Sequence, residues 1–347
     1  MATRNHGRHP RSSRARPLSG VILEIVLGII LGITALGTSL TPAGVPAALA
    51  SSEASEAVPG RHLCGTRILT PEEARPFIAE LPRAGTLPPS LDWRDLDAWT
   101  EAKNQETCGG CWAFAAIACV EAMGRIKGAP ASLDLSEQHA LSCDLDSWVI
   151  EGQTVTNNGC CGGTVAVFEF LKERGTVREE DFPFGNGDHY GPGACFPGSD
   201  WETIPCPATE PKTSSWQVTS WSLLSAYVAT VDQIKTALQR GPVWCAYYVY
   251  SDFYPQYWFS NQTETPYRHT SGHLVAGHAV LVIGYDDADQ CWIVKNSWGP
   301  TGPFGDGTFR IAYDSNCSFG INAAICEVDG TTPVEHSTMG RLRLAFR

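Results

Sequence analysis

The pattern of apolar and polar positions divides the chain into three regions. An apolar run extends from Val21 to about Leu40 and is interrupted only by Glu24 and small residues. Apolar residues then recur at helical spacing over Cys111–Ile126 and Val165–Glu173. Beyond Ser220 apolar and polar residues alternate between turn signals, over Val243–Tyr250, Ala279–Tyr285, Cys291–Lys295 and Thr308–Ala312. Helices followed by strands predict an α+β protein behind an apolar leader.

The apolar leader has the composition of a secretory signal. Residues 1–17 contain five arginines and no acidic residue, and Ala48-Leu49-Ala50 follows the apolar run. A basic start, an apolar middle and a small-x-small exit predict cleavage after Ala50 and secretion. The alternative is an uncleaved membrane anchor, because the run approaches the roughly 20 residues that span a bilayer. We expect contact with a membrane only in that second case.

Two changes of composition divide the rest of the chain. Residues 51–88 are rich in Ala, Glu, Pro and Arg, with one short helical stretch at Pro71–Ile78, and predict a pro-segment or linker. Residues 185–215 are rich in Gly, Pro, Asp and Cys and predict a surface loop at a domain boundary. We therefore expect a main domain at 89–330, with a helical half at about 100–205 and a β half at about 216–330. A polar tail follows at 331–347.

Charge and cysteine content narrow the class of protein. The chain has 25 Lys+Arg against 37 Asp+Glu, a net charge of −12, which excludes nucleic acid as a main partner. It also has 13 cysteines, too many for ordinary core packing in a reducing compartment. If the others pair, one cysteine is left over, as a spare thiol or as a working nucleophile.

One fragment places a cysteine where a nucleophile is favoured. Cys111 follows Gly109-Gly110 at the start of the predicted apolar helix. A helix N-terminus stabilises a thiolate, since it presents unpaired N–H groups and a positive dipole end. Gln105 precedes it on the same loop and could form a two-donor oxyanion hole with the backbone N–H of Cys111. Cys108 and Cys111 also form a CxxC, so a redox pair, half of a zinc site and two structural cysteines remain open.

Two further fragments supply a histidine and an asparagine. His278 begins an apolar strand, and Asn296 ends the next strand, just before Trp298. An asparagine side chain that accepts a hydrogen bond from histidine would fix the tautomer and the ring orientation, and Trp298 could shield that bond from water. Taken singly, a buried structural histidine, a turn asparagine and a core tryptophan are the alternatives.

Taken in order, these fragments resemble the papain and cathepsin type of cysteine peptidase, from about Leu87 to about Val328. The motifs that carry the resemblance are Asp92-Trp93-Arg94, Gln105 with Cys108–Phe114, Ser136-Glu137-Gln138, Cys160-Cys161-Gly162-Gly163, Gly277-His278-Ala279 and Lys295-Asn296-Ser297-Trp298-Gly299. The resemblance implies a papain-like two-domain α+β fold, with a helical left domain, a β-barrel-like right domain and an active-site cleft between them. It also implies that Cys111 is the nucleophile, His278 its base and acid, Asn296 the orienting residue and Gln105 an oxyanion donor.

The resemblance further implies where a substrate binds. Gly162 and Gly163 would hold the substrate backbone, beside Trp298, and the main selectivity pocket would be lined by small apolar residues, namely Val165, Ala246, Ala276, Ala279 and Ala324. The pocket has no acid at its floor, so we expect a bulky apolar or aromatic residue one position before the cleaved residue (P2). Disulfides Cys108–Cys160 and Cys143–Cys195 are also implied.

The sequence thus predicts a secreted, monomeric cysteine endopeptidase that acts on proteins or peptides and needs no cofactor or metal. It departs from the family pattern at Glu106-Thr107 and Gly109-Gly110, and it lacks the second tryptophan that commonly follows the position of Trp298. Two alternatives belong to other classes: a catalytically silent relative used for binding, and a CxxC thiol-redox protein.

Overall fold

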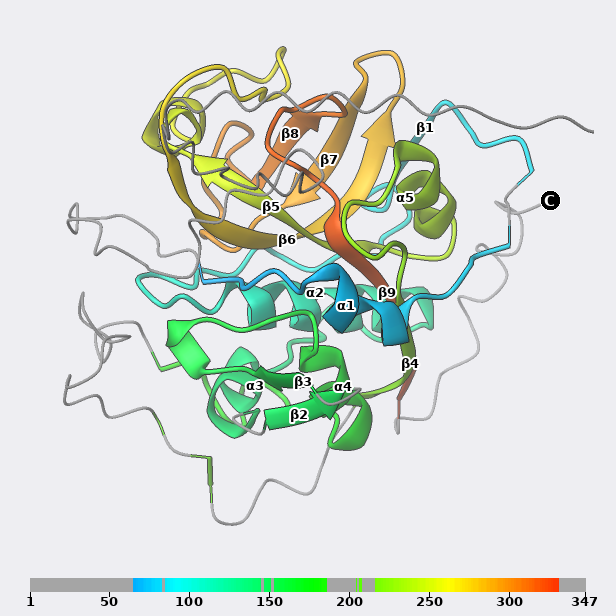
Figure 1. The fold of residues 1–347 in the computed structure, drawn as a ribbon, viewed down its shortest axis with the longest axis vertical. Coiled ribbons are helices and arrows are strands. Elements are labelled where there is room, and N and C mark those ends of the chain that lie inside the picture. The colour runs from blue at the N-terminus through cyan, green and yellow to red at the C-terminus, as the bar shows by residue number, and fades with distance from the viewer. Residues whose placement is uncertain are drawn as a thin grey trace, which may run out of the picture. The chain divides into compact units, whose positions relative to one another are not determined.

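A helical half packs against an antiparallel sheet in the computed structural model of the protein (Figure 1). The residues that the structure describes are 65–82, 85–144, 147–150, 153–185, 204, 206–207 and 216–330. The predicted leader, the first part of the pro-segment and the tail at 331–347 lie outside these residues.

Helices and one hairpin make up the first half. Its elements are α1 (Pro71–Ala74), the 3₁₀ turn η2 (Arg75–Phe77), α2 (Cys111–Ile126), α3 (Glu137–Cys143), the hairpin strands β2 (Ser147–Ile150) and β3 (Gln153–Thr156), the 3₁₀ turn η3 (Gly159–Cys161) and α4 (Val167–Glu173). The predicted helix at Cys111–Ile126 is confirmed at both ends. The helix predicted from Val165 begins two residues later, at Val167.

The second half is built on a seven-stranded sheet. Its strands are β1 (Ser90–Asp92), β4 (Trp216–Leu223), β5 (Val243–Tyr250), β6 (Leu274–Asp286), β7 (Cys291–Lys295), β8 (Thr308–Ala312) and β9 (Ile321–Gly330). The order is β4-β9-β5-β6-β7-β8, with β1 added to β6, and every pairing is antiparallel. An irregular helical turn, η5 (Asp252–Tyr257), follows β5 and is interrupted at Tyr254, whose backbone is extended.

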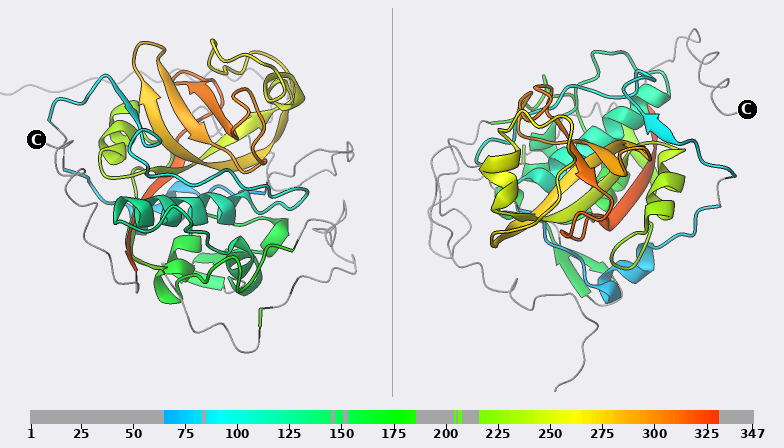
Figure 2. Two further views of the ribbon diagram at one scale, coloured as in Figure 1. Left: turned by 180° about the vertical axis from the view of Figure 1, so that it is seen from behind. Right: turned by 90° about the horizontal axis from the view of Figure 1, so that it is seen from above.

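The central helix α2 joins the two halves. It contacts β5, β6 and β9 on one side and α3 and α4 on the other. In Figure 2 the helix, in teal, accordingly lies between the yellow-to-orange strands and the green helices. Nearly every residue from Cys111 to Gly124 is buried, and five alanines allow the neighbouring elements to approach closely. The start of α2 therefore lies inside the molecule, at the junction of helices and sheet.

The prediction of strands alone beyond Ser220 is wrong at one segment. Val231–Leu238 forms helix α5, which packs against β5 and β6. Thr230 accepts a hydrogen bond from the backbone N–H of Gln233, and the Gln233 side chain accepts one from the backbone N–H of Thr230. This reciprocal capping box is a helix-start signal that can be read in the sequence.

Two disulfides join segments of the helical half. Cys108 is bonded to Cys160, as the resemblance implies. Cys143 is bonded to Cys206, so the predicted pairing with Cys195 is wrong. Cys195 itself lies outside the described residues. Both candidates fall in the same loop rich in Gly and Pro, and the spacing of cysteines does not determine which two meet in space.

The described residues show neither a membrane-spanning helix nor a cluster of metal ligands. No helix in the described ranges is both long and apolar enough to cross a bilayer. The described residues also contain no group of three or more His, Cys, Asp or Glu side chains placed to hold a metal ion.

Candidate active site

Cys111 lies at the first turn of α2, at the base of a covalently fixed loop. Gly110 is the N-cap residue and provides no side-chain cap; in the first turn, the N–H of Ala113 donates to the backbone oxygen of Gly110 at 2.9 Å. The disulfide between Cys108 and Cys160 fixes the loop that leads into Cys111. A 2.9 Å hydrogen bond from Gly109 N to Cys160 O holds the same loop. The nucleophile candidate is therefore held by main chain and disulfide on one side and by a buried helix on the other.

The environment of Cys111 favours its thiolate. Burial alone would raise the pKa of the thiol, but the charge and hydrogen bond of His278 outweigh it and lower the pKa to about 7. Smaller contributions come from the Thr66 hydroxyl, 3.4 Å from the sulfur, and from the backbone N–H of Ala279, 3.5 Å away. A thiolate–imidazolium pair can therefore form near neutral pH.

His278 is held by the predicted asparagine and tryptophan. Its Nε2 lies 2.7 Å from Asn296 Oδ1, which fixes the orientation of the imidazole. Trp298 stacks on the imidazole with ring centroids 4.9 Å apart, and it is almost fully buried. The edge of Tyr247, the cross-strand neighbour of His278, packs against another side of the ring. The structure thus brings Cys111, His278, Asn296 and Trp298 together from three different elements.

Gln105 is fixed by a residue to which the sequence analysis gave no role. Ser297 Oγ donates to Gln105 Oε1 at 2.5 Å, and Gln105 N donates to Ser297 O at 2.8 Å. Gln105 Nε2 donates to Cys108 O at 2.7 Å, so the amide N–H end faces the loop that carries Cys111. Ser297 lies inside a quoted motif, yet its role depends on a contact between residues 192 positions apart.

The Gly162-Gly163 edge is occupied by the chain's own segment around Thr66, which lies before the predicted main domain. Gly163 N donates to Gly65 O at 2.9 Å, and Arg67 N donates to Gly163 O at 2.8 Å, in a parallel bridge centred on Thr66. A Cβ on Gly162, whose φ is +116°, would lie 2.3 Å from the backbone oxygen of Gly65. Only glycine allows an extended chain to approach this closely.

We call Gly65–Thr70 the strap, because it covers Cys111. Figure 1 shows this stretch, in blue, crossing between the sheet and the helical half before it enters α1. Thr66 N donates to Gly277 O at 3.3 Å, and Cys111 is fully buried with the strap in place. A salt bridge of Arg67 to Glu73 and the capping box of Thr70 and Glu73 hold the strap to α1. Residues of the predicted pro-segment therefore lie across Cys111, although the described part of this segment forms only the short elements α1 and η2.

The predicted pocket residues come from both halves. Ala246 and Ala279 are cross-strand partners on β5 and β6, and Ala324 on β9 is paired with Trp244. All three are fully buried, whereas Ala276 is half-buried opposite Val249. Val165 is buried in the turn that precedes α4. Four of the five residues thus lie on neighbouring strands of the sheet.

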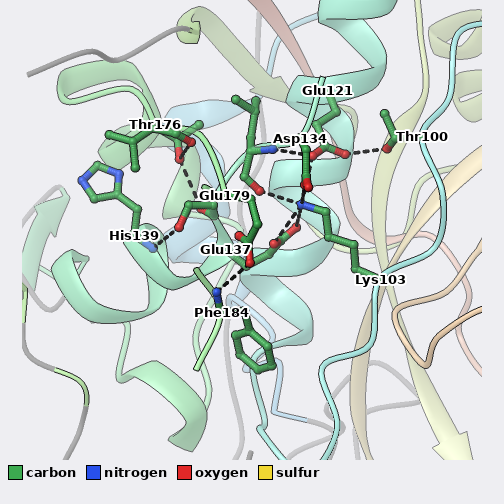
Figure 3. A network of polar contacts seen from close by, with 12 residues as sticks. Thr100, Lys103, Glu121, Asp134, Glu137, His139, Thr176, Glu179 and Phe184 are labelled. Carbon is green, nitrogen blue, oxygen red and sulfur yellow. Dashed lines mark hydrogen bonds and ion pairs between the residues drawn. The ribbon is translucent and has the colours of Figure 1, made fainter. Parts of the chain in front are cut away.

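A buried network of charged side chains lies behind the site (Figure 3). Lys103 Nζ lies 3.1 Å from Glu121, 2.7 Å from Asp134 and 3.0 Å from Glu137. Thr100 connects this group to the strand that carries Asn296, because it donates to Glu121 and accepts from Lys295 Nζ at 2.8 Å. Glu137 and Lys295 belong to two of the sequence motifs, but those motifs do not predict this network.

The two buried glutamates of the network differ in charge. Burial opposes ionisation of Glu121, but Lys103 and Lys295 outweigh it and lower its pKa. Burial raises the pKa of Glu137 to about 8, against the attraction of Lys103 and with the help of repulsion from Glu121. Near neutral pH, Glu121 is therefore the anion of the pair and Glu137 is largely protonated.

The odd cysteine count is not explained by Cys111 alone. Among the described cysteines, five others are unpaired and buried, namely Cys119, Cys245, Cys291, Cys317 and Cys326. The condition that all the other cysteines pair is therefore not met, and parity does not single out Cys111. The pairing of Cys108 with Cys160 also opposes a CxxC redox pair, because Cys108 is not bonded to Cys111.

The sequence model of the papain family cysteine proteases matches residues 87–328. The chain belongs to the papain family. The fold is the α+β papain fold expected from the motifs, with the site at the junction of helices and sheet.

Papain-family relatives and solved structures agree with this assignment. Cysteine proteinase 2 of Entamoeba histolytica is 30% identical over 240 residues, 66% of this chain and 65% of that protein. Procathepsin L of Rattus norvegicus is 30% identical over 246 residues, 69% of this chain and 64% of that protein. The chain thus spans slightly less than two thirds of the length of these two relatives. The structure of bromelain protease from Ananas comosus with the E64 inhibitor is 29% identical, has a TM-score of 0.50 and covers 70% of this chain and 99% of that chain.

Proposed function

We propose that the protein is a secreted cysteine endopeptidase that is made in a latent form. The observation that carries the proposal is the arrangement of Cys111, His278 and Asn296. A buried thiol whose pKa is lowered to about 7 faces an imidazole, and an asparagine 2.7 Å from that imidazole orients it. Structural cysteines in this chain have the opposite property, since burial raises the pKa of Cys291 to about 11.

The mechanism follows from these positions. His278 takes the proton of Cys111, and the thiolate attacks the carbonyl carbon of a peptide bond. The amide of Gln105 has two N–H groups; one donates to Cys108 O, and the other is assigned to the oxyanion together with the N–H of Cys111. His278 then protonates the leaving amine, and water hydrolyses the thioester to release the second product and restore the thiol.

Latency follows from the strap. Because Thr66 lies on the sulfur and Gly163 is paired with the strap, a substrate backbone cannot reach the same edge until the strap moves. A catalytically silent binding protein would share the fold. The lowered pKa of Cys111 favours the peptidase over that alternative, because a silent site has no need for a stabilised thiolate.

The function is tested by labelling and cleavage. The purified chain is treated with a thiol-directed epoxide, before and after mild proteolysis of the pro-segment, and the adduct is mapped. We expect one adduct at Cys111 and cleavage of a denatured protein substrate, both lost in Cys111→Ala, with activity reduced roughly 10⁴-fold or more. Cys291→Ala, which removes another unpaired buried cysteine, is the matched control and keeps both. Cleavage that persists in Cys111→Ala would reject the proposal.

Specificity is proposed from the small residues of the predicted pocket. Ala246, Ala279 and Ala324 are small and apolar and contribute no charge, so we expect Leu, Phe or Tyr at P2 to be preferred to Arg. The measurement is kcat/KM for fluorogenic peptides that differ only at P2. The apolar peptides should exceed the Arg peptide by about 10-fold or more, and a preference for Arg would contradict this pocket.

A further inference from the structure

Asn322, the second residue of β9, combines two unfavourable features. Its φ is +46°, in the left-handed region that non-glycine residues rarely adopt. Its side chain is only 1% exposed, and Nδ2 has no hydrogen-bond partner among the residues that the structure describes. Strained backbone and unpaired buried polar groups are both costly, and such costs concentrate at functional sites.

The same side chain contacts the strap. Asn322 Oδ1 accepts a hydrogen bond from Leu69 N at 2.8 Å, and Leu69 is fully buried. Two further main-chain N–H groups of the strap are bound nearby, Thr66 by Gly277 O and Arg67 by Gly163 O. The protein therefore accepts three N–H groups of one extended segment, two of them with backbone carbonyls and the third with the side chain of Asn322.

We propose that Asn322 is a binding residue for the peptide backbone in the cleft, occupied by the strap in the latent form and by a peptide substrate afterwards. A primary amide presents an acceptor and a donor side by side, which matches the N–H and C=O of a peptide group. Such recognition does not depend on the bound side chain. Oδ1 of Asn322 already accepts the N–H of Leu69, and Nδ2 would donate to a C=O of the bound peptide. The substrate half of the proposal rests on the function proposed above.

A purely structural role makes a different prediction. If Asn322 were present only to allow a positive φ, glycine would replace it without loss, because glycine adopts this conformation freely. Asn322→Gly therefore separates the two roles, and Asn322→Asp keeps an acceptor for Leu69 N. Asn316 is the matched control: it is an exposed asparagine with φ +59° whose Nδ2 donates to His269 O at 3.3 Å.

The first test measures how fast iodoacetamide alkylates Cys111 in the full chain, where the strap limits access. We expect Asn322→Gly to be alkylated about 10-fold faster than wild type, Asn322→Asp within about threefold of it, and Asn316→Gly unchanged. Leu69→Pro removes the donor instead, and it should raise the rate similarly. The two changes combined should add little, because they remove one hydrogen bond.

Unfolding is distinguished from release of the strap by the buried cysteine Cys119. A variant that unfolds exposes Cys119 as well as Cys111, whereas release of the strap exposes Cys111 alone. If Asn322→Gly unfolds by this criterion, the alkylation rate of Cys111 in Leu69→Pro tests the proposal in its place. Wild-type alkylation rates in the folded variants would overturn the proposal, and this result does not depend on whether the protein cleaves peptides.

The second test concerns substrate binding after activation of the full chain. Loss of a contact made equally in the ground and transition states raises KM and leaves kcat nearly unchanged. We expect KM to rise about 5- to 10-fold in Asn322→Gly, with kcat within twofold of wild type. An unchanged KM would reject the substrate half alone. Absence of any cleavage by the wild-type chain would reject the proposed function and leave the strap contact standing.

Discussion

At the scale of single residues, the site depends on opposing influences on one sulfur. Burial favours the neutral thiol of Cys111, and His278 favours the thiolate more strongly. His278 can do so because Asn296 fixes its ring and Trp298 covers it. The reactivity of Cys111 is therefore a property of its neighbours, whereas burial raises the pKa of Cys291 to about 11 and leaves its thiol neutral.

The pH dependence of alkylation follows from this balance. A lowered pKa means that the thiolate forms at lower pH, so the rate at Cys111 should rise with pH to half its maximum near pH 7. In His278→Ala only burial remains as the main influence, and the midpoint should move above the ordinary value of 9.0. Iodoacetamide rates followed by mass spectrometry between pH 5 and 10 would show this. A wild-type midpoint near 9.0 would contradict the thiolate–imidazolium pair.

At the scale of elements, α2, α3 and β7 are joined by buried charges. Glu121 on α2, Glu137 on α3 and Lys295 on β7 surround Lys103, which lies in the loop before α2. Breaking a buried ion pair by removal of one charge costs roughly 3–5 kcal/mol, whereas loss of a group that is already neutral costs far less. The two glutamates of this network should therefore respond differently to the same substitution.

We expect Glu121→Gln to lower the free energy of unfolding by roughly 3–5 kcal/mol at pH 7, and Glu137→Gln by less than about 1 kcal/mol. Glu121 is charged there, while the pKa of Glu137 is raised to about 8, so glutamine resembles its protonated form. Urea unfolding of the two matched variants measures the difference. Equal losses would mean that Glu137 is ionised in the folded protein.

The pH dependence of stability provides an internal check. Because its folded-state pKa is raised from 4.5 to about 8, Glu137 stabilises the folded chain in its protonated form. That contribution is fully present below pH 4.5 and is lost as the pH rises to about 8. Relative to wild type, Glu137→Gln should thus become more stable between pH 5 and pH 8. A difference that is constant with pH would contradict the raised pKa.

At the scale of the whole molecule, the disulfides and most of the unpaired cysteines lie in different halves. The bridges Cys108–Cys160 and Cys143–Cys206 both lie in the helical half, and Cys161 is also disulfide-bonded. Four of the unpaired cysteines, Cys245, Cys291, Cys317 and Cys326, lie on or beside the strands of the sheet. The disulfides therefore constrain the region around the loop that leads into Cys111, whereas the sheet is stabilised by packing.

This division predicts a labelling map. Alkylation of the denatured, unreduced chain should modify Cys111, Cys119, Cys245, Cys291, Cys317 and Cys326, and should leave Cys108, Cys143, Cys160 and Cys206 unmodified. In the folded chain, reagent at neutral pH should modify Cys111 before Cys291, because the pKa of Cys111 is lowered to about 7 and that of Cys291 is raised to about 11. A peptide that links Cys143 to Cys195 would contradict the bridge described here.

The sequence by itself determined the features that depend on local pattern. The bounds of α2, β7 and β8 follow from the periodicity of apolar residues, and the motifs around Cys111, His278 and Asn296 indicated the family and the chemistry. These signals are local because a helix or strand is recognised by which neighbouring positions are apolar.

Only the tertiary structure decided which distant groups meet. Cys143 pairs with Cys206, Ser297 fixes Gln105, and Asn322 binds Leu69 across 253 positions of the chain. The charge states of Glu121 and Glu137 likewise depend on burial and on cations that come from other segments. A sequence pattern records the type of each residue, whereas hydrogen bonds, disulfides and pKa values depend on distances that folding sets.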